Sequence, residues 1–329
     1  FFANESREIF GTMFRTSPLL AIEKSVLNLA VLLISFFSHD WLKKHKHLPE
    51  FFMLLFSSLL GFFFMLSSNN LLMFYLALEL STIPLAALCN FDLEKKVSSE
   101  AAMKMIMSSA FSSAILLFGI SMIYGTTGSL DFATIAHSLN GSQLQILSFI
   151  LIFTGFAFKL SIVPFHLWTA DVYEGSPVAV TAYLSVVSKG AMAFVFITSL
   201  YTAFAPLAFT WFYVIAVAAA VTITIGNLFA IRQQNLKRFF AFSSIAQVGY
   251  LLIAISSASQ IGVASVVYFI LIYVFTNLAA FAVISIISSQ TGKETINDYK
   301  GLYASNPTLA LLLSLALFSL AGIPPTAGF

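Results

Sequence analysis

Residues 144–170 read LQILSFILIFTGFAFKLSIVPFHLWTA, an apolar run with Lys159 near its middle and Pro164 shortly after it. The run exceeds the roughly twenty apolar residues that cross a hydrocarbon core of about 30 Å as a helix. Its hydrophobicity is continuous, which is typical of a membrane helix and not of a barrel strand. Proline removes a backbone donor and clashes with the preceding turn. The stretch therefore predicts a membrane helix that is broken near Pro164 and carries a lysine inside the membrane.

The whole chain has the composition of an integral membrane protein. Hydrophobic residues make up 59% of its 329 residues and charged residues 9%, with a net charge of +2 and a mean hydropathy of +0.93. Soluble domains carry roughly 45–50% apolar and about 25% charged residues, so a soluble fold is excluded. Cys89 is the single cysteine, which excludes a disulfide framework or a cysteine metal cluster. The first residue is not Met and residues 321–329 end inside an apolar segment, so we expect a fragment cut at both ends.

Ten stretches are long and apolar enough to cross a membrane, which predicts an all-α, polytopic transmembrane helix bundle. They are residues 17–38, 50–68, 71–91, 101–124, 144–170, 177–203, 208–230, 238–256, 261–289 and 308 to the end.

The positive charges test this count because they fall in alternate loops. The basic loops contain Lys43, Lys44 and Lys46, then Lys95 and Lys96, then Arg232, Lys237 and Arg238, then Lys293 and Lys300. The opposite loops, around Asn69 and at 124–143, 201–208 and 257–260, contain no Lys or Arg. Correctly counted helices show this alternation, with the basic loops facing the cytoplasm or the mitochondrial matrix.

Six charged residues lie inside the predicted spans, beyond the first residue of each span. They are Glu23, Lys24, Glu79, Lys104, Lys159 and Lys189. A charge at the bilayer centre costs at least about 2.5–3.5 kcal/mol, so such residues face the bundle interior and commonly serve transport. Near a span end a long side chain reaches the interface instead.

The distance of each charged residue from the nearest span end indicates whether an interfacial or a functional role is favoured. For Glu23 and Lys24, near a span end, a local pair reaching the interface is favoured, and for Lys104 neither role is favoured. Glu79, Lys159 and Lys189 are too deep for that, so a functional role is favoured over a structural ion pair. Burial disfavours an ammonium and a nearby carboxylate favours it, so Glu79 beside Lys159 predicts a unit that binds and releases protons.

Three further titratable residues follow Lys159. His166 lies two helical turns beyond it, and a packed histidine and a proton-relay residue are equally supported. Asp171 and Glu174 stand at the cytoplasmic mouth, where they form either a solvated turn or an ion-collecting pair.

A second break, Gly322-Ile323-Pro324-Pro325, interrupts the tenth predicted span, five spans after the first. An odd offset means opposite insertion, so the pair predicts an inverted repeat within a single domain, 1–329. The first repeat is expected at about 50–204, and an incomplete second at about 208–329.

Several longer motifs together resemble a known family. They are FKLSIVPFHLWTADVYEGSP (158–177), EAAMK (100–104), FSSAILLFG (111–119), NLKR (235–238), FSSIAQVGY (242–250) and LAGIPPTAGF (320–329). The chain resembles the subunit N (subunit 2) family of NADH:quinone oxidoreductase, respiratory complex I, whose members are antiporter-like, proton-translocating membrane subunits. Most members have Trp-Ala/Thr-Pro-Asp where this chain has Trp168-Thr-Ala170-Asp171, a loss of a loop proline but of no titratable group.

The resemblance implies a fold of fourteen spans and a proton path through Glu79, Lys104, Lys159 and Lys189, with His166 as a water-contacting relay residue. The family's closing lysine falls just beyond Phe329. The implied partners are other membrane subunits of complex I, including further antiporter-like subunits, and the lipid bilayer, with no nucleic acid. NADH, FMN, iron–sulfur clusters and quinone are implied in the complex, whereas no catalytic redox site, cofactor or metal is expected in this chain. This agrees with the absence of a dinucleotide glycine fingerprint and of a cysteine set.

Two alternatives stay open from sequence. One is a subunit of a multi-subunit cation/proton antiporter or a membrane-bound hydrogenase, and the other is a structural membrane scaffold whose buried charges are inert pairs. The expected location is the bacterial plasma membrane, with the mitochondrial inner membrane as the alternative.

Overall fold

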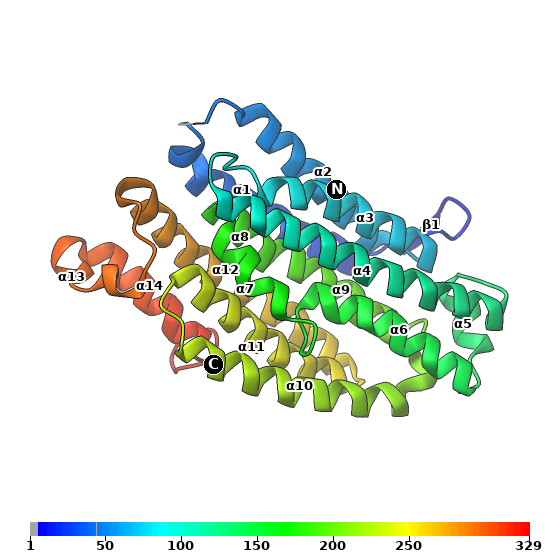
Figure 1. The fold of residues 1–329 in the computed structure, drawn as a ribbon. Helices are drawn as coiled ribbons and strands as arrows, with labels where there is room; N and C mark the ends of the chain where they lie inside the picture. The colour runs from blue at the N-terminus through cyan, green and yellow to red at the C-terminus, as the bar shows by residue number, and fades with distance from the viewer. Residues whose placement is uncertain (1–5, 44) are drawn as a thin grey trace.

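The computed structural model describes residues 6–43 and 45–329, and its long helices lie side by side in one bundle (Figure 1). Lys44 of the first basic loop lies outside the described residues. Nine helical segments of the described part are long and apolar enough to cross a membrane. They are α1 (Pro18–Leu42), α2 (Leu48–Ser67), α3 (Leu71–Cys89), α4 (Lys96–Thr127), α6 (Gln143–Leu160), α8 to α9 (Val178–Tyr201), α10 with its preceding 3-10 turn (Ala205–Ile231), α11 (Leu236–Ser256) and α12 (Gln260–Thr291).

The remaining elements are short. They are β1 (Arg7–Ile9) and β2 (Phe14–Thr16), which pair antiparallel, α5 (Phe132–Ser138), α7 (Leu167–Gly175), a 3-10 turn (Ile296–Tyr299), α13 (Leu302–Ser305) and α14 (Pro307–Leu320). The all-α polytopic bundle is thus confirmed. The tenth predicted span is α14, a 14-residue helix shorter than the other nine.

The basic loops gather at one end of the bundle, near α13 in Figure 1, and α5 and β1 lie at the opposite end. At the basic end His45 Nε2 lies 3.2 Å from Asp92, and Lys237 Nζ lies 3.0 Å from Glu294. The alternation of loop charge along the sequence therefore separates the two ends of the bundle. Lys237 differs from the expectation of a loop residue, because it lies in the first turn of α11 and is only 5% exposed.

The predicted break near Pro164 is confirmed. Helix α6 ends at Leu160, and Ser161 turns the chain into the left-handed region with φ of 64°. The amide of Ile162 donates back to the Ala157 carbonyl over 2.8 Å, which closes the helix end. The chain resumes as α7 only at Leu167, so a non-helical segment lies between the two halves of the predicted span.

The second break has the same local geometry. Helix α14 ends at Leu320, Gly322 takes φ of 69°, and the Ile323 amide donates to the Phe318 carbonyl over 3.0 Å. The left-handed residue Ser161 directly follows the end of α6, and Gly322 comes two positions after the end of α14. In both breaks a proline comes shortly afterwards, Pro164 in the first and Pro324 in the second. The shared geometry supports the inverted repeat, which stays a prediction.

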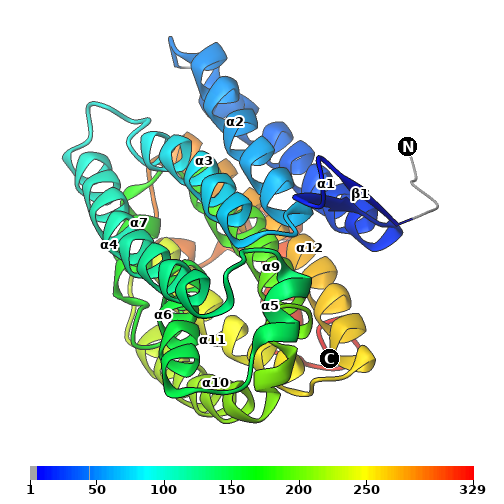
Figure 2. The same cartoon turned by 90° about the vertical axis from the view of Figure 1, so that its right-hand side faces the viewer.

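A central helix carries the last buried lysine. It consists of α8 (Val178–Tyr183), a π-helix (Leu184–Ser188) and α9 (Lys189–Tyr201). Every residue from 179 to 197 is buried, because α1, α2, α6 and α12 pack around this segment. Figure 2 shows α9 in the interior of the bundle.

Candidate functional site

Lys159 lies in the last turn of α6 and is only 7% exposed. Its ammonium donates to the hydroxyl of Thr82 on α3 over 2.6 Å and to the hydroxyl of Ser109 on α4 over 3.1 Å. Among the ion pairs of the described residues, none includes Lys159. The expected orientation toward the bundle interior is confirmed, and neutral hydroxyls hold the ammonium.

Glu79 lies on α3, one helical turn before Thr82, and is half-buried. It accepts a hydrogen bond from the Ser113 hydroxyl on α4, one turn after Ser109. The Glu79 carboxylate is also within electrostatic reach of the Lys159 ammonium. The structure therefore brings Glu79 and Lys159 to one junction of α3, α4 and α6, where hydroxyls stand beside each charge.

Lys189 is the first residue of α9, directly after the π-helix, and is 4% exposed. Its ammonium donates to the Ser244 hydroxyl on α11 over 2.7 Å and lies 5.5 Å from the ring centre of Tyr173. The ring face attracts the positive charge and partly replaces the water that burial removes. Like Lys159, Lys189 has no salt bridge within the described ranges.

His166 lies elsewhere than the sequence interpretation places it. The interpretation assumed a continuous helix, on which His166 follows Lys159 by two turns. The helix instead ends at Leu160, and His166 comes at the end of the non-helical segment, with Lys189 within electrostatic reach. Its ring is buried, and Nδ1 has no hydrogen-bond partner among the described residues. His166 is thus associated with Lys189.

Lys104 belongs to a charge network at the basic end of the bundle. Its ammonium lies 2.6 Å from Glu100, on the same helix, and 2.6 Å from Asp171 on α7. Arg238 on α11 contacts the other oxygen of Asp171 at 2.7 Å and Glu174 at 2.8 Å. The Lys104 side chain is 41% exposed, so this lysine lies at the surface of the basic end of the bundle. Asp171 links α7 to α4 and α11 through ion pairs, and Glu174 links α7 to α11. The two acids therefore do not form a free solvated turn.

Glu23 and Lys24 lie within electrostatic reach of each other but make no direct ion pair among the described residues. Consecutive residues on a helix do not face each other. Lys24 donates to the Ser67 hydroxyl at the end of α2 over 2.6 Å. Glu23 is only 2% exposed, and its Oε2 has no hydrogen-bond partner in the described part of the chain. Arg15 in β2 is within electrostatic reach of Glu23.

Sequence reasoning missed the hydroxyl groups that hold the lysines. These are Thr82, Ser109, Ser113 and Ser244. Their signal was available in part, because Ser109 and Ser113 are four residues apart and so share one face of an otherwise apolar helix. Among the described residues no group of three His, Cys, Asp or Glu could hold a metal ion.

Comparison with known proteins agrees with this arrangement. Residues 68–329 match the model of the family described as NADH:quinone oxidoreductase/Mrp antiporter, TM. The chain belongs to this family. The family match includes both breaks and the residues around Glu79, Lys159 and Lys189.

Relatives of known sequence match almost the whole chain. NADH-quinone oxidoreductase subunit N of Phocaeicola vulgatus is 50% identical over 99% of this chain and 70% of its own length. The subunit N of Azobacteroides pseudotrichonymphae is 48% identical over 98% of this chain and 68% of its own length.

Solved structures show the same fold. A chain of respiratory complex I from Thermus thermophilus superposes with a TM-score of 0.81 at 28% identity, over 99% of this chain and 70% of that chain. A chain of the Mrp complex from Dietzia has a TM-score of 0.81 at 23% identity, over 95% of this chain and 58% of that one. This second likeness shows the family fold alone.

Proposed function

We propose that this chain is the proton-translocating subunit N of a bacterial NADH:quinone oxidoreductase, or complex I. One observation carries the mechanism: the Lys159 ammonium is buried between membrane helices and held by the hydroxyls of Thr82 and Ser109. The relatives named subunit N, at 50% and 48% identity, place the chain in complex I rather than in an Mrp antiporter. Redox chemistry takes place in other subunits, and the partners of this chain are other membrane subunits.

The Lys159 site can both hold and release a proton. Burial disfavours the ammonium form, and the Glu79 charge favours it. Hydroxyls accept from the ammonium and can donate to the neutral amine, so Thr82 and Ser109 suit both forms of the lysine. A change in the position of Glu79 therefore changes how strongly its charge stabilises the Lys159 ammonium. This is how quinone reduction elsewhere in the complex drives a proton through Glu79, Lys159, Lys189 and their neighbours.

Lys104 and His166 are the two remaining residues of the proposed proton path. Lys104 stands at the mouth, where its ion pairs with Glu100 and Asp171 concentrate charge at the entrance. His166, within electrostatic reach of Lys189, is placed to exchange a proton on the far side of the α6 break.

Glu79→Gln tests the coupling. Glutamine keeps an oxygen that accepts from Ser113 but removes the charge that favours the Lys159 ammonium. We expect coupled proton pumping in vesicles with assembled complex to fall on the order of tenfold, the scale of a lost proton-transfer partner. Glu94→Gln changes an exposed carboxylate and serves as the matched control. Equal pumping by the two variants would show that Glu79 does not act on Lys159.

Membrane orientation is a separate proposal. The basic end faces the cytoplasm, as the positive-inside rule requires, and the membrane is the bacterial plasma membrane. A cysteine placed at Lys95, which is 64% exposed, should react with an impermeant reagent from the cytoplasmic side only. A cysteine at Ser129, in the loop before α5, should react from the outside only. The Cys89→Ala background removes the native thiol, and reaction of both sites from one side would overturn the topology.

Subunit composition separates complex I from its rival assemblies. Mass spectrometry of the material that copurifies with a tagged chain should identify flavin and iron–sulfur subunits. Copurification with small antiporter subunits alone would instead support the antiporter alternative.

A further inference from the structure

A buried hydroxyl near Lys189 lacks a hydrogen bond. Tyr173 on α7 is 0% exposed, and its hydroxyl has no hydrogen-bond partner among the described residues. The hydroxyls of Ser244 and Ser185 face it without meeting the geometry of a hydrogen bond. Leaving a buried hydroxyl unpaired costs free energy, so such a group calls for an explanation beyond packing.

The neighbours of Tyr173 are hydroxyls on three other helical elements. On one side Ser244 accepts from the Lys189 ammonium at 2.7 Å. On the other side Ser185, in the π-helix, lies 3.0 Å from the hydroxyl of Tyr273 on α12. Single π-helical turns are rare and often lie at functional sites. Hydroxyls from α7, the π-helix, α11 and α12 therefore gather on one side of Lys189.

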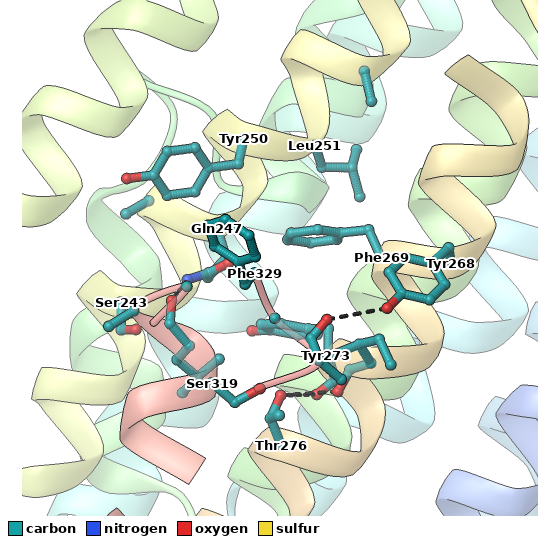
Figure 3. A pocket seen from close by; sticks show the side chains of 18 of the residues that line it. Ser243, Gln247, Tyr250, Leu251, Tyr268, Phe269, Tyr273, Thr276, Ser319 and Phe329 are labelled. Carbon is teal, nitrogen blue, oxygen red and sulfur yellow. Dashed lines mark hydrogen bonds between the residues drawn. The ribbon is translucent and has the colours of Figure 1, made fainter. Parts of the chain in front are cut away.

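Tyr273 lines a large cleft between α11, α12, α14 and the segment after α14, residues 321–329. The cleft has a volume of about 1110 Å³, and Tyr273 stands among the side chains that line it (Figure 3). Gln247, Thr276 and Ser319 give this lining a polar part, and the Gln247 amide donates to the Leu320 carbonyl at the second break. The hydroxyl series thus runs from Lys189 to the part of the bundle that contains α14.

We propose that Ser244, Tyr173, Ser185 and Tyr273 form a hydroxyl bridge that carries protons between Lys189 and the cleft beside α14. The inference rests on the proposed function and adds the route by which Lys189 exchanges its proton. An N–H bond of Lys189 breaks as an O–H bond forms at Ser244, whose former proton passes to Tyr173. The same exchange passes along Ser185 and Tyr273 to a water molecule in the cleft. Each hydroxyl ends with one proton, and Lys189 is left neutral.

A structural role is the competing explanation, since buried hydroxyls often satisfy one another. It accounts for the Ser185 and Tyr273 pair but not for the Tyr173 hydroxyl, which is close to Ser185 and Ser244 and has no hydrogen-bond partner among the described residues. In a bridge, a hydroxyl must break and remake its bonds as each proton passes. Tyr173 has the position that this exchange requires.

Tyr273→Phe and Ser185→Ala test the bridge in vesicles that contain the assembled complex. Each removes one hydroxyl with little change in shape, and coupled proton pumping should fall by about tenfold, as for one lost hydrogen bond in the rate-limiting transfer. The solvent deuterium isotope effect on turnover should rise, because proton transfer becomes slower than the other steps. Ser185→Thr keeps the hydroxyl and should retain pumping.

Tyr183→Phe is the matched control. Tyr183 is also fully buried, but its hydroxyl donates to the Leu55 carbonyl on α2, away from the bridge. Its loss should leave pumping and the isotope effect unchanged.

The outcomes separate the bridge from the proposed function. Normal pumping by Tyr273→Phe and Ser185→Ala, with impaired pumping by Lys159→Ala, would overturn the bridge alone. Normal pumping by Lys159→Ala would overturn the proposed function. Should Tyr273→Phe fail to assemble on native gels, the comparison of Ser185→Ala with Ser185→Thr decides, and equal pumping by these two would reject the bridge.

Discussion

Replacing Lys159 with arginine is expected to lower proton pumping nearly as far as replacing it with alanine. Arginine keeps the positive charge beside Thr82 and Ser109, but a guanidinium does not release its proton near neutral pH. Alanine removes the proton-binding site altogether. We expect both variants to lose pumping by about tenfold or more, the lower end of what a positioned proton-transfer group contributes.

The measurement is proton pumping per NADH oxidised in membrane vesicles, with assembly verified on native gels. Lys300→Arg makes the same exchange at an exposed lysine of the basic end and should pump normally. Normal pumping by Lys159→Arg would mean that the residue supplies a fixed charge and carries no mobile proton. A loss of assembly in Lys159→Ala but not in Lys159→Arg would separate a packing effect from the loss of the relay.

Gly61→Val is expected to destabilise the protein more than any other single change considered above. A Cβ atom at Gly61 would lie 2.5 Å from the backbone nitrogen of Ser81, so the backbones of α2 and α3 touch there. One turn earlier, Ser58 on α2 donates to the Ser81 carbonyl over 3.0 Å. Small residues allow this close approach between membrane helices. A branched side chain would force α3, the helix of Glu79, away from α2.

The expected cost is about 3 kcal/mol or more, because backbone atoms cannot give way as a flexible side chain does. Gly125→Val is the matched control, since a Cβ at Gly125 on α4 meets no atom within 4 Å. The amount of assembled complex on native gels, and the temperature at which pumping is irreversibly lost, measure the difference. Equal values for the two variants would contradict the close contact of α2 and α3.

The membrane helices, their alternation and the first break were predictable because each depends on local sequence. Apolar length sets a span, loop charge sets its direction, and Pro164 interrupts it. The burial of Lys159 and Lys189 also followed from their depth along the chain. These features require no knowledge of which helices become neighbours.

The partners of the charges depend on helix neighbours and rotation, and there the sequence interpretation was incomplete. Thr82 and Ser109 meet Lys159 only because α3, α4 and α6 share a junction. His166 was misplaced because the left-handed turn at Ser161 redirects the chain.

Two further charges were misjudged. The burial of Glu23 was missed because its depth along α1 says nothing of what packs against it. Lys237 was placed in a loop because the predicted span begins at residue 238, whereas α11 begins at Leu236 and Lys237 pairs with Glu294, a residue far away in sequence.

The burial of the central helix has a consequence for biosynthesis. No residue from 179 to 197 remains exposed in the folded bundle, yet a helix that leaves the translocon meets lipid first. Inserting Lys189 at that stage costs about 2.5–3.5 kcal/mol, which the apolar residues on both sides of it must offset. Helices α1, α2 and α6 are already synthesised and can receive the new helix, but α12, which also packs against it, emerges later. The Lys189 ammonium meets its Ser244 partner only after α11 has been inserted, so until then the nascent chain holds a lysine without that hydrogen bond in the bilayer.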